Sequence, residues 1–192
     1  MARKADPKNF ERVLDAAAAL FLDVGYDAAS MQQLADRLGL HKSSLYHYVN
    51  SKEDLLEHLI DEAQTTAEHD LEIAEQDLEN GYLTAVKLAI EQTLNDRSRV
   101  SLVLRQKPGT ATGDGAIARR RAYDRRLAKL IEHGQASRTI RDDIHPMLLA
   151  RLTLGMVSWL IEWYDPELSR FEPDEVRDAV MAIVTSGVVV GE

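Results

Sequence analysis

Apolar residues recur at helical spacing along almost the whole chain. In the first such stretch, residues 7–27, a single face at this spacing is formed by Phe10, Val13, Leu14, Ala17, Leu20 and Phe21. Asp6 precedes this face as a candidate N-cap, and Pro7 can take the first helical position, where a missing N–H costs nothing. Gly25 is a typical terminator. The pattern therefore predicts a helix that ends near Gly25.

Two short helices and one long helix are expected next. Ser30 and Gln33 have the spacing of a capping box in front of residues 31–38, and Gly39 closes that segment. The stretch 42–49, "KSSLYHYV", follows at once as a second short helix. Ser51 precedes a long amphipathic run over 52–76, with acid in its first turn at Asp54.

The remainder of the chain has the same helical character. Residues 82–106 predict one or two helices with a break near Asn95 and Asp96, and residues 108–115, "PGTATGDG", predict a flexible glycine-rich loop. Three further helices are expected over 116–135, 145–166 and 173–190. No strand-like alternation is longer than the apolar tail at 188–190. The pattern indicates an all-α fold of about nine helices.

Composition narrows the class of protein without identifying it. The chain has 192 residues, of which 45% are hydrophobic and 29% charged, values typical of a globular protein with a real core. It has no apolar run long enough to span a bilayer, and its start lacks the apolar region of a secretory signal. There is no Cys for disulfides or thiolate metal sites. We expect a cytoplasmic protein.

Charge is distributed unevenly along the chain. The formal net charge is −9, which argues against binding nucleic acid by bulk charge alone. Residues 1–52 contain seven Lys and Arg against six Asp and Glu, a net charge of +1, so the remainder carries −10. The N-terminal quarter is therefore the part that would not repel a polyanion on average.

The two short helices around Gly39 have the organisation of a helix-turn-helix motif. In that motif the second helix lies in the DNA major groove, with its N-terminal residues at the base edges. The side chains that it would present are Lys42, Ser43, Ser44, Tyr46 and His47. The side chains that would face the core are Leu34, Leu38, Leu40, Leu45 and Val49. Hydroxyl, imidazole and ammonium groups can donate to phosphates and to base edges.

The run "SMQQLADRLGLHKSSLYHYVNSKEDLLEHLI" resembles the DNA-binding domain of TetR-type (tetracycline-repressor-like) regulators. The positions that carry the resemblance are Leu34-Ala35, Gly39-Leu40, Leu45-Tyr46, His47-Tyr48 and Ser51 to Leu55. It implies a helix-turn-helix domain over 1–52 and a larger helical domain for effector binding and dimerisation over 53–192. The resemblance also implies that some side chains contact the phosphates or sugars of the DNA backbone. Together with the helix-turn-helix positions, the DNA-binding candidates are Ser30, His41, Lys42, Ser43, Ser44, Tyr46, His47 and Lys52.

The resemblance also implies a homodimer formed by the last two long helices, and a small-molecule pocket in the second domain. The segment "GMVSWLIEWYDPE" is similar to the C-terminal region of members that respond to acyl-CoA thioesters. Candidate effector-binding residues are Tyr82, Leu88, Leu104, Arg105, Tyr123, Met156, Trp159 and Trp163. The expected function is ligand-responsive transcriptional regulation, more often repression in this family. The dimer would bind a pseudo-palindromic operator and be released by a small hydrophobic or acyl-CoA-like effector.

Other interpretations stay open at this point. The Tyr46-His47-Tyr48 cluster is also consistent with half-buried packing. The run "RRRAYDRR" at 119–126 suits a solvated helix face or part of an effector pocket better than a second nucleic-acid patch. A helical scaffold that binds only protein is the main alternative function. An enzyme is less favoured, because the chain contains no HExxH, P-loop or GxSxG motif, and no cofactor is expected. A metal is also not expected, because His41 and His47 are six positions apart, the wrong spacing for one helical face.

Overall fold

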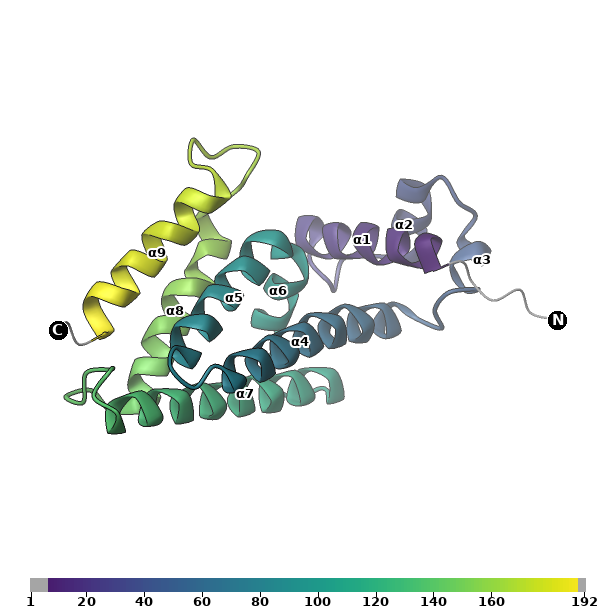
Figure 1. Cartoon of the computed structure of the whole chain (residues 1–192). Coiled ribbons are helices and arrows are strands. Elements are labelled where there is room, and N and C mark those ends of the chain that lie inside the picture. Colours follow the sequence, from purple (N-terminus) through teal and green to yellow (C-terminus); the bar gives the residue numbers. More distant parts are fainter. Residues whose placement is uncertain (1–6, 190–192) are drawn as a thin grey trace. The chain divides into compact units, whose positions relative to one another are not determined.

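The structure, a computed structural model, describes residues 7–189, and within that range it confirms an all-α fold of nine helices (Figure 1). The helices are α1 (Pro7–Val24), α2 (Met31–Leu38), α3 (Lys42–Leu45), α4 (Lys52–Gln76), α5 (Gly81–Asn95), α6 (Arg97–Leu104), α7 (Ala111–Ala136), α8 (Pro146–Trp163) and α9 (Pro173–Val188). The apolar tail contributes only an isolated β-bridge between Ile140 and Val189. The cap expected at Asp6 lies outside the described residues. Within the described range, no helix combines the length and apolarity needed to span a membrane.

The described chain folds into two compact units. The N-unit consists of residues 7–63 and 98–106, and the C-unit consists of residues 64–97 and 107–189. The long helix α4 contributes its first half to the N-unit and its second half to the C-unit, while most of α6 belongs to the N-unit. The expected functional division between residues 52 and 53 stays a prediction.

In the N-unit, α1 packs on α2, and α2 packs on α3. The apolar face expected on α1 is buried from Val13 to Phe21, as the helical spacing requires. Phe10, at the start of this face, is partly exposed and stacks on the ring of Tyr48, with ring centroids 6.3 Å apart.

Local capping sets the ends of the helices in the N-unit. The capping box is confirmed, because the Ser30 amide donates to Gln33 Oε1 at 2.9 Å and the Gln33 amide donates to Ser30 Oγ at 3.2 Å. Gly39 ends α2 in the left-handed region, at φ 64°, which favours glycine. The Asp54 amide donates to Ser51 Oγ at 3.0 Å in front of α4, as the N-cap pattern predicts. These caps fix both ends of α2 and the start of α4, whereas α3 begins after His41 without a side-chain cap.

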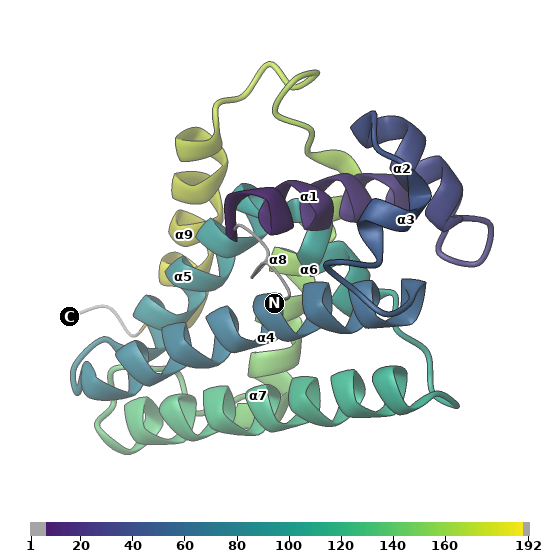
Figure 2. The ribbon, with the colours of Figure 1, turned by 90° about the vertical axis from the view of Figure 1, so that its right-hand side faces the viewer.

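In the C-unit, α8 packs against α5 and α7, and α5 also packs against α7 and α9. The second half of α4 runs alongside α7 in both ribbon views (Figures 1 and 2). Two arginines of α7 bind acids of α4, with Arg119 Nε 2.7 Å from Glu68 Oε1 and Arg126 Nε 2.8 Å from Glu75 Oε1. These bonds place part of the arginine-rich run in ion pairs within the C-unit.

The flexible loop expected over 108–115 is wrong in its second half. α7 already begins at Ala111, with the Thr110 side chain accepting from the Gly113 amide at 3.0 Å. A Cβ atom at Gly113 would lie 2.1 Å from the carbonyl oxygen of Lys107. This glycine is therefore explained by close packing inside a helix, and the run of glycines does not mark a linker.

Candidate functional site

The surface formed by α3 and the turn that follows it is anchored by two buried apolar residues. Leu45 and Val49 are fully or almost fully buried, as predicted. The helix expected over 42–49 is nevertheless too long, because α3 ends at Leu45 and Val49 lies beyond the turn that follows it. The expectation that Leu40 faces the core is wrong, because this side chain is 40% exposed in the turn between α2 and α3. The turn ends α2 at Gly39, so the helical spacing that places Leu34 inside no longer applies to Leu40.

Most of the predicted DNA-contacting side chains of this segment are accessible. Tyr46 is 47% exposed, and Ser44 is half-buried. The exposed members also include His41, Lys42, Ser43 and His47. The Tyr-His-Tyr cluster is thus divided between surface and packing, because Tyr48 is half-buried against Phe10 while its two predecessors face solvent. The surface offers one ammonium, two imidazoles and several hydroxyl groups, a set that can bind phosphates and base edges.

Ser30 is exposed, but its hydroxyl already has a partner. Its Oγ lies 2.9 Å from Gln33 Oε1 and accepts from the Gln33 amide. The capping box thus uses some of the donors that a free helix N-terminus would offer to a phosphate. Contact of Ser30 with DNA stays a prediction.

Lys52 has an internal role in the N-unit. Its Nζ donates to the carbonyl oxygens of Tyr26, Asp27 and Ala29 at 2.7, 3.3 and 2.8 Å. The same ammonium lies 4.5 Å from the centroid of the Tyr26 ring, a cation–π contact. Lys52 therefore ties the turn between α1 and α2 to the start of α4. Its predicted contact with a phosphate would have to compete with these bonds.

An ion-pair cluster centred on Arg99 was not expected from the sequence. Arg99 Nε lies 3.1 Å from Glu62 Oε2 and its Nη2 lies 3.1 Å from Asp15 Oδ1, while Nη2 also binds Glu11. The guanidinium is mostly buried and joins α6 to α1 and α4 inside the N-unit. Burial raises the pKa of Glu62, and the Arg99 charge opposes that rise. No local motif marks this contact, because its members are far apart in the sequence.

The eight effector-binding candidates do not form one site. Tyr82, Tyr123 and Met156 belong to or pack against the hydrophobic cluster of the C-unit. Burial raises the pKa of the Tyr123 phenol, with Asp70 contributing a smaller rise. Leu88 is partly buried on α5. Leu104 and Arg105 belong to the N-unit, and Trp159 and Trp163 lie on the outer face of α8.

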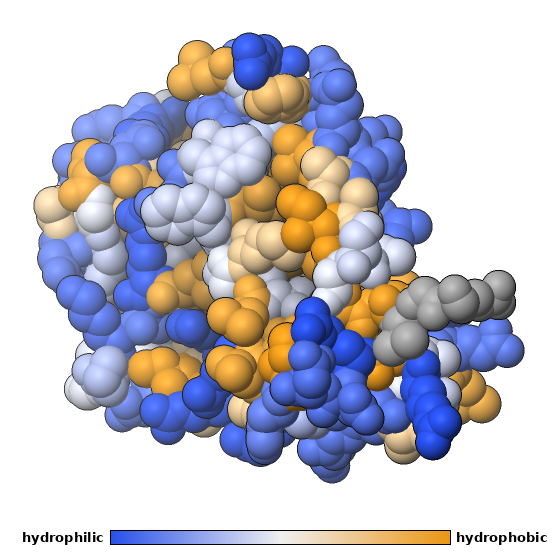
Figure 3. Space-filling model, turned by 90° about the vertical axis from the view of Figure 1, so that its left-hand side faces the viewer, coloured by the Kyte–Doolittle hydropathy of each residue, from blue (hydrophilic) through white to orange (hydrophobic). Residues whose placement is uncertain are grey.

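That outer face of α8 is apolar and exposed in the single chain. Trp159 is 64% exposed, and a band of apolar side chains crosses the corresponding side of the molecule (Figure 3). Exposed large apolar residues of α8 and α9 are Leu148, Leu152, Trp159, Trp163 and Ile183. The C-terminal end of α8 is held by Arg97, whose Nη2 donates to the Ile161 carbonyl at 2.8 Å. The sequence predicts burial of α8 on several sides, and within the single chain only its inner face is buried.

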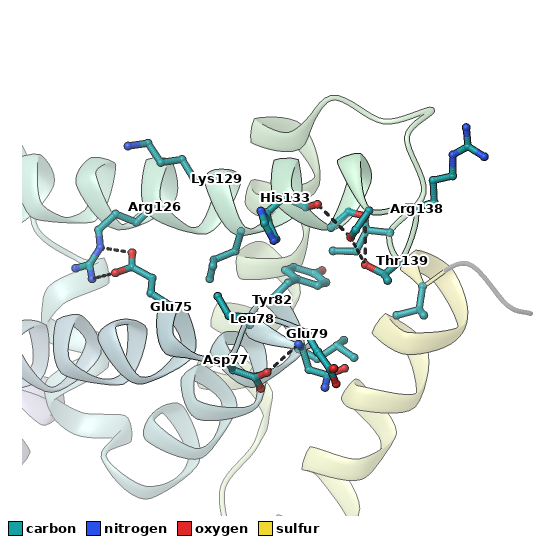
Figure 4. Close-up of a pocket in the computed structure, with 18 residues that line it drawn as sticks. Glu75, Asp77, Leu78, Glu79, Tyr82, Arg126, Lys129, His133, Arg138 and Thr139 are labelled. Carbon is teal, nitrogen blue, oxygen red and sulfur yellow. Dashed lines mark hydrogen bonds and ion pairs between the residues drawn. The ribbon is translucent and has the colours of Figure 1, made fainter.

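A cleft of about 920 Å³ opens at the end of the C-unit, between α7 and the turn that joins α4 to α5 (Figure 4). Its lining includes Leu78, Tyr82 and Leu130, with His133 pointing toward the Tyr82 ring. Tyr82 is the only one of the effector-binding candidates among the residues that line this cleft. Within residues 7–189, no group of His, Asp and Glu side chains has the arrangement of a metal site.

Two family models match most of the chain. Residues 13–59 match bacterial regulatory proteins of the tetR family, and residues 83–188 match the tetracyclin repressor-like C-terminal domain. The HTH-type transcriptional repressor KstR2 of Mycolicibacterium smegmatis is 25% identical over 187 residues, 93% of this chain and 89% of its own length. The matches thus cover both the N-unit helix-turn-helix motif and most of the C-unit.

Solved structures share the fold. SCO3833, a TetR regulator from Streptomyces coelicolor A3, is 31% identical with a TM-score of 0.79, over 99% of this chain and 94% of that one. KstR2 of Mycobacterium tuberculosis is 18% identical with a TM-score of 0.87, over the full length of both chains. AibR, in complex with isovaleryl coenzyme A and operator DNA, is 24% identical with a TM-score of 0.77, over 91% of this chain and 96% of that one.

Proposed function

Because the chain belongs to the tetR family of bacterial regulatory proteins, we propose that it is a ligand-responsive transcriptional repressor that binds its operator as a dimer. One observation carries the DNA-binding part of the proposal. The segment after Gly39 is anchored by buried Leu45 while Lys42, Tyr46 and His47 remain exposed. A recognition helix needs this combination, because a rigid base must present polar side chains to the major groove.

The acidic character of the whole chain is compatible with this role. Binding requires a few well-aimed donors, and the exposed side chains from His41 to His47 supply them without an excess of positive charge. Backbone amides at helix starts would add contacts with phosphate that need no cationic side chain.

Dimerisation through α8 and α9 is supported by their exposed outer faces. Burial of a large apolar side chain such as Trp159 or Leu152 in a partner subunit is worth about 1.5–3 kcal/mol each. On α9 the exposed residues around Ile183 are small, which permits close approach of helices. A dimer would place two recognition helices about 34 Å apart on a pseudo-palindromic operator.

The effector is proposed to be small and hydrophobic or an acyl-CoA thioester. The fold is shared with AibR, whose complex holds isovaleryl coenzyme A, and Tyr123 and Met156 pack on the hydrophobic cluster that such an acyl group could enter. An effector that binds better to a conformation with misaligned DNA-binding units would lower operator affinity by the same factor. The proposal further includes a cytoplasmic location and no enzymatic activity.

The direct test is a fluorescence-anisotropy titration of the chain against DNA from upstream of its own coding sequence. We expect saturable binding that weakens as salt rises, and much weaker binding to a scrambled duplex of equal length. A folded dimer that binds neither duplex at low salt would contradict the proposal and favour a scaffold that binds only protein.

A further inference from the structure

We infer that the cleft between α7 and the α4–α5 turn is a small-molecule site for an amphiphile with an apolar body and an anionic group. The site is separate from Tyr123 and Met156, the core residues proposed to meet the effector, since neither lines the cleft. A ligand in this cleft is not required for operator binding, so binding of the probe is measured on the chain without DNA.

The size and floor of the cleft suit the apolar part of such a ligand. Small-molecule sites usually measure about 300–1,000 Å³, and this cleft of about 920 Å³ lies within that range. The apolar side chains of the lining are Leu78, Tyr82, Leu83, Leu130, Ile140 and Val189. The Tyr82 hydroxyl is already bonded to Thr153, so its ring acts as an apolar surface toward the cleft.

Leu78 is the clearest sign that the apolar floor is unfilled. It lies in the short turn between α4 and α5 and is 79% exposed, although it points into the cleft toward α7 (Figure 4). Covering such a side chain with an apolar ligand removes its surface from water, which favours binding.

The wall of the cleft that α7 forms carries hydrogen-bond donors that are not used within the described chain. Arg126, Lys129 and His133 recur at i, i+3 and i+7 along the face of α7 that lines the cleft. The Arg126 guanidinium binds both oxygens of Glu75 at 2.8 Å. Among the described residues, the Lys129 ammonium and the His133 ring form no hydrogen bond, and they lie one helical turn apart.

Most of the carboxylates on the opposite wall, formed by the end of α4 and the α4–α5 turn, already accept hydrogen bonds from the protein. Asp77 accepts from the Asn80 amide at 2.9 Å and from the Thr84 hydroxyl at 2.8 Å, and Glu75 is bound by Arg126. Glu79 is the acid of this wall whose carboxylate has no bond within the described chain. Free donors therefore outnumber free acceptors, and the ligand that complements them carries a carboxylate or a phosphate.

Two glycines allow close packing at the walls of the cleft. A Cβ atom at Gly134 would lie 2.5 Å from Ile140 Cδ1, and one at Gly81 would lie 2.6 Å from the Ala74 carbonyl oxygen. Glycine at both positions lets the α7–α8 loop and the start of α5 close around the site. A preformed site loses little conformational entropy on binding.

The test uses the full chain and dodecanoate as the anionic probe, below its micellar concentration. Isothermal titration calorimetry compares it with dodecanol, which has the same apolar body without the charge, and with dodecyltrimethylammonium, which has the opposite charge. We expect dodecanoate to bind at least about tenfold more tightly than either. Equal binding of the three probes, or no binding of dodecanoate, overturns the inference.

Two variants locate the probe in the cleft. Lys129→Glu and Leu78→Asp change exposed side chains, and each is expected to weaken dodecanoate binding at least about tenfold. Their matched controls, Arg121→Glu on α7 and Leu168→Asp in the α8–α9 loop, change exposed residues outside the cleft and should bind as the parent chain does. Unchanged binding in both cleft variants contradicts the assignment.

Operator binding of the same samples separates this inference from the proposed function. Loss of dodecanoate binding with intact operator binding in the Lys129→Glu variant supports the cleft as a site of its own. If the parent chain binds operator but not dodecanoate, the cleft is not a ligand site, and the proposed regulatory function is unaffected.

Discussion

The hydroxyl oxygens of Tyr82 and Thr153 lie 2.7 Å apart, and both side chains are buried. Tyr82 belongs to α5 and lines the cleft with its ring, whereas Thr153 belongs to the inner face of α8. Burial raises the pKa of the Tyr82 phenol, and the hydrogen bond to Thr153 opposes that rise. The pair therefore links the floor of the cleft to the helix that carries the exposed apolar face.

Removing one hydroxyl of this pair should destabilise the C-unit. Tyr82→Phe leaves the Thr153 hydroxyl buried without a partner, which costs about 1–3 kcal/mol in the free energy of unfolding. Thr153→Val should cost a similar amount. The double variant should cost clearly less than the sum, as measured by urea denaturation. Strict additivity of the two costs would show that the hydrogen bond contributes nothing.

Lys42→Ala and His47→Ala should weaken operator binding without changing the melting temperature, because both side chains are exposed. If Lys42 neutralises a phosphate, its removal lowers the slope of log affinity against log salt by about 0.9. Fluorescence anisotropy at several salt concentrations measures both effects. Lys87→Ala, at an exposed lysine of α5, is the control. Unchanged affinity in both variants would remove this segment from the DNA-contacting surface.

Lys52→Met should behave differently from a loss of DNA contact alone. It deprives the carbonyl oxygens of Tyr26 and Ala29 of a charged donor, and we expect a loss of about 1–3 kcal/mol in the free energy of unfolding. Thermal denaturation monitored by circular dichroism measures the loss. Lys42→Met, which removes an exposed lysine of α3, should leave the unfolding transition where it is. Equal stability of the two variants would mean that the internal bonds of Lys52 are not stabilising.

Charged substitutions on the outer face of α8 should dissociate the proposed dimer. Trp159→Glu and Leu152→Glu place a carboxylate where a partner would bury an apolar side chain, while the inner face of α8 is untouched. Sedimentation velocity is expected to show a dimer for the parent chain and a folded monomer for either variant. Leu78→Glu, at a comparably exposed leucine outside α8, should remain dimeric. A parent chain that sediments as a monomer would contradict the dimer outright.

The Asp77 carboxylate gives a prediction about pH. Bonds from the Asn80 amide and the Thr84 hydroxyl lower the pKa of Asp77 below its usual 3.8. A lowered pKa contributes stability that is fully present above the unfolded value and is lost as pH falls through the folded value. Thr84→Ala should raise the pKa of Asp77 toward 3.8, as measured by NMR titration of its carboxyl carbon. An unshifted pKa would show that the Thr84 hydroxyl does not act on this carboxylate.

Features that depend on neighbours in the sequence were predictable. The capping box at Ser30, the left-handed Gly39 and the break after Asn95 follow from residue types a few positions apart. Leu45 and Val49 were correctly expected to be buried, although Val49 lies after the end of α3 and not on it. The segment after Gly39 could therefore be located from the sequence, and its buried side was assigned correctly except at Leu40.

Features that depend on contacts between distant residues were not predictable. Lys52 has the pattern of a phosphate-binding lysine, but it is held by carbonyls more than twenty positions away. Gly113 resembles a loop glycine, although its role is set by the Lys107 carbonyl packed against a helix start. The effector-binding candidates share only their residue types, and the type of a residue does not determine which other residues line the same cavity.

The Arg99 cluster has a consequence for dividing the molecule. α6 packs with the N-unit, yet the chain on either side of it, through Arg97 and from Lys107, belongs to the C-unit. A fragment cut after residue 63 would keep Glu11, Asp15 and Glu62 but lose the guanidinium that they share. Three acids would then face one another without their counter-ion. The N-unit therefore cannot be transferred to another protein by cutting the chain after residue 63. A chimera would also have to include α6, which begins thirty-odd positions further along the chain.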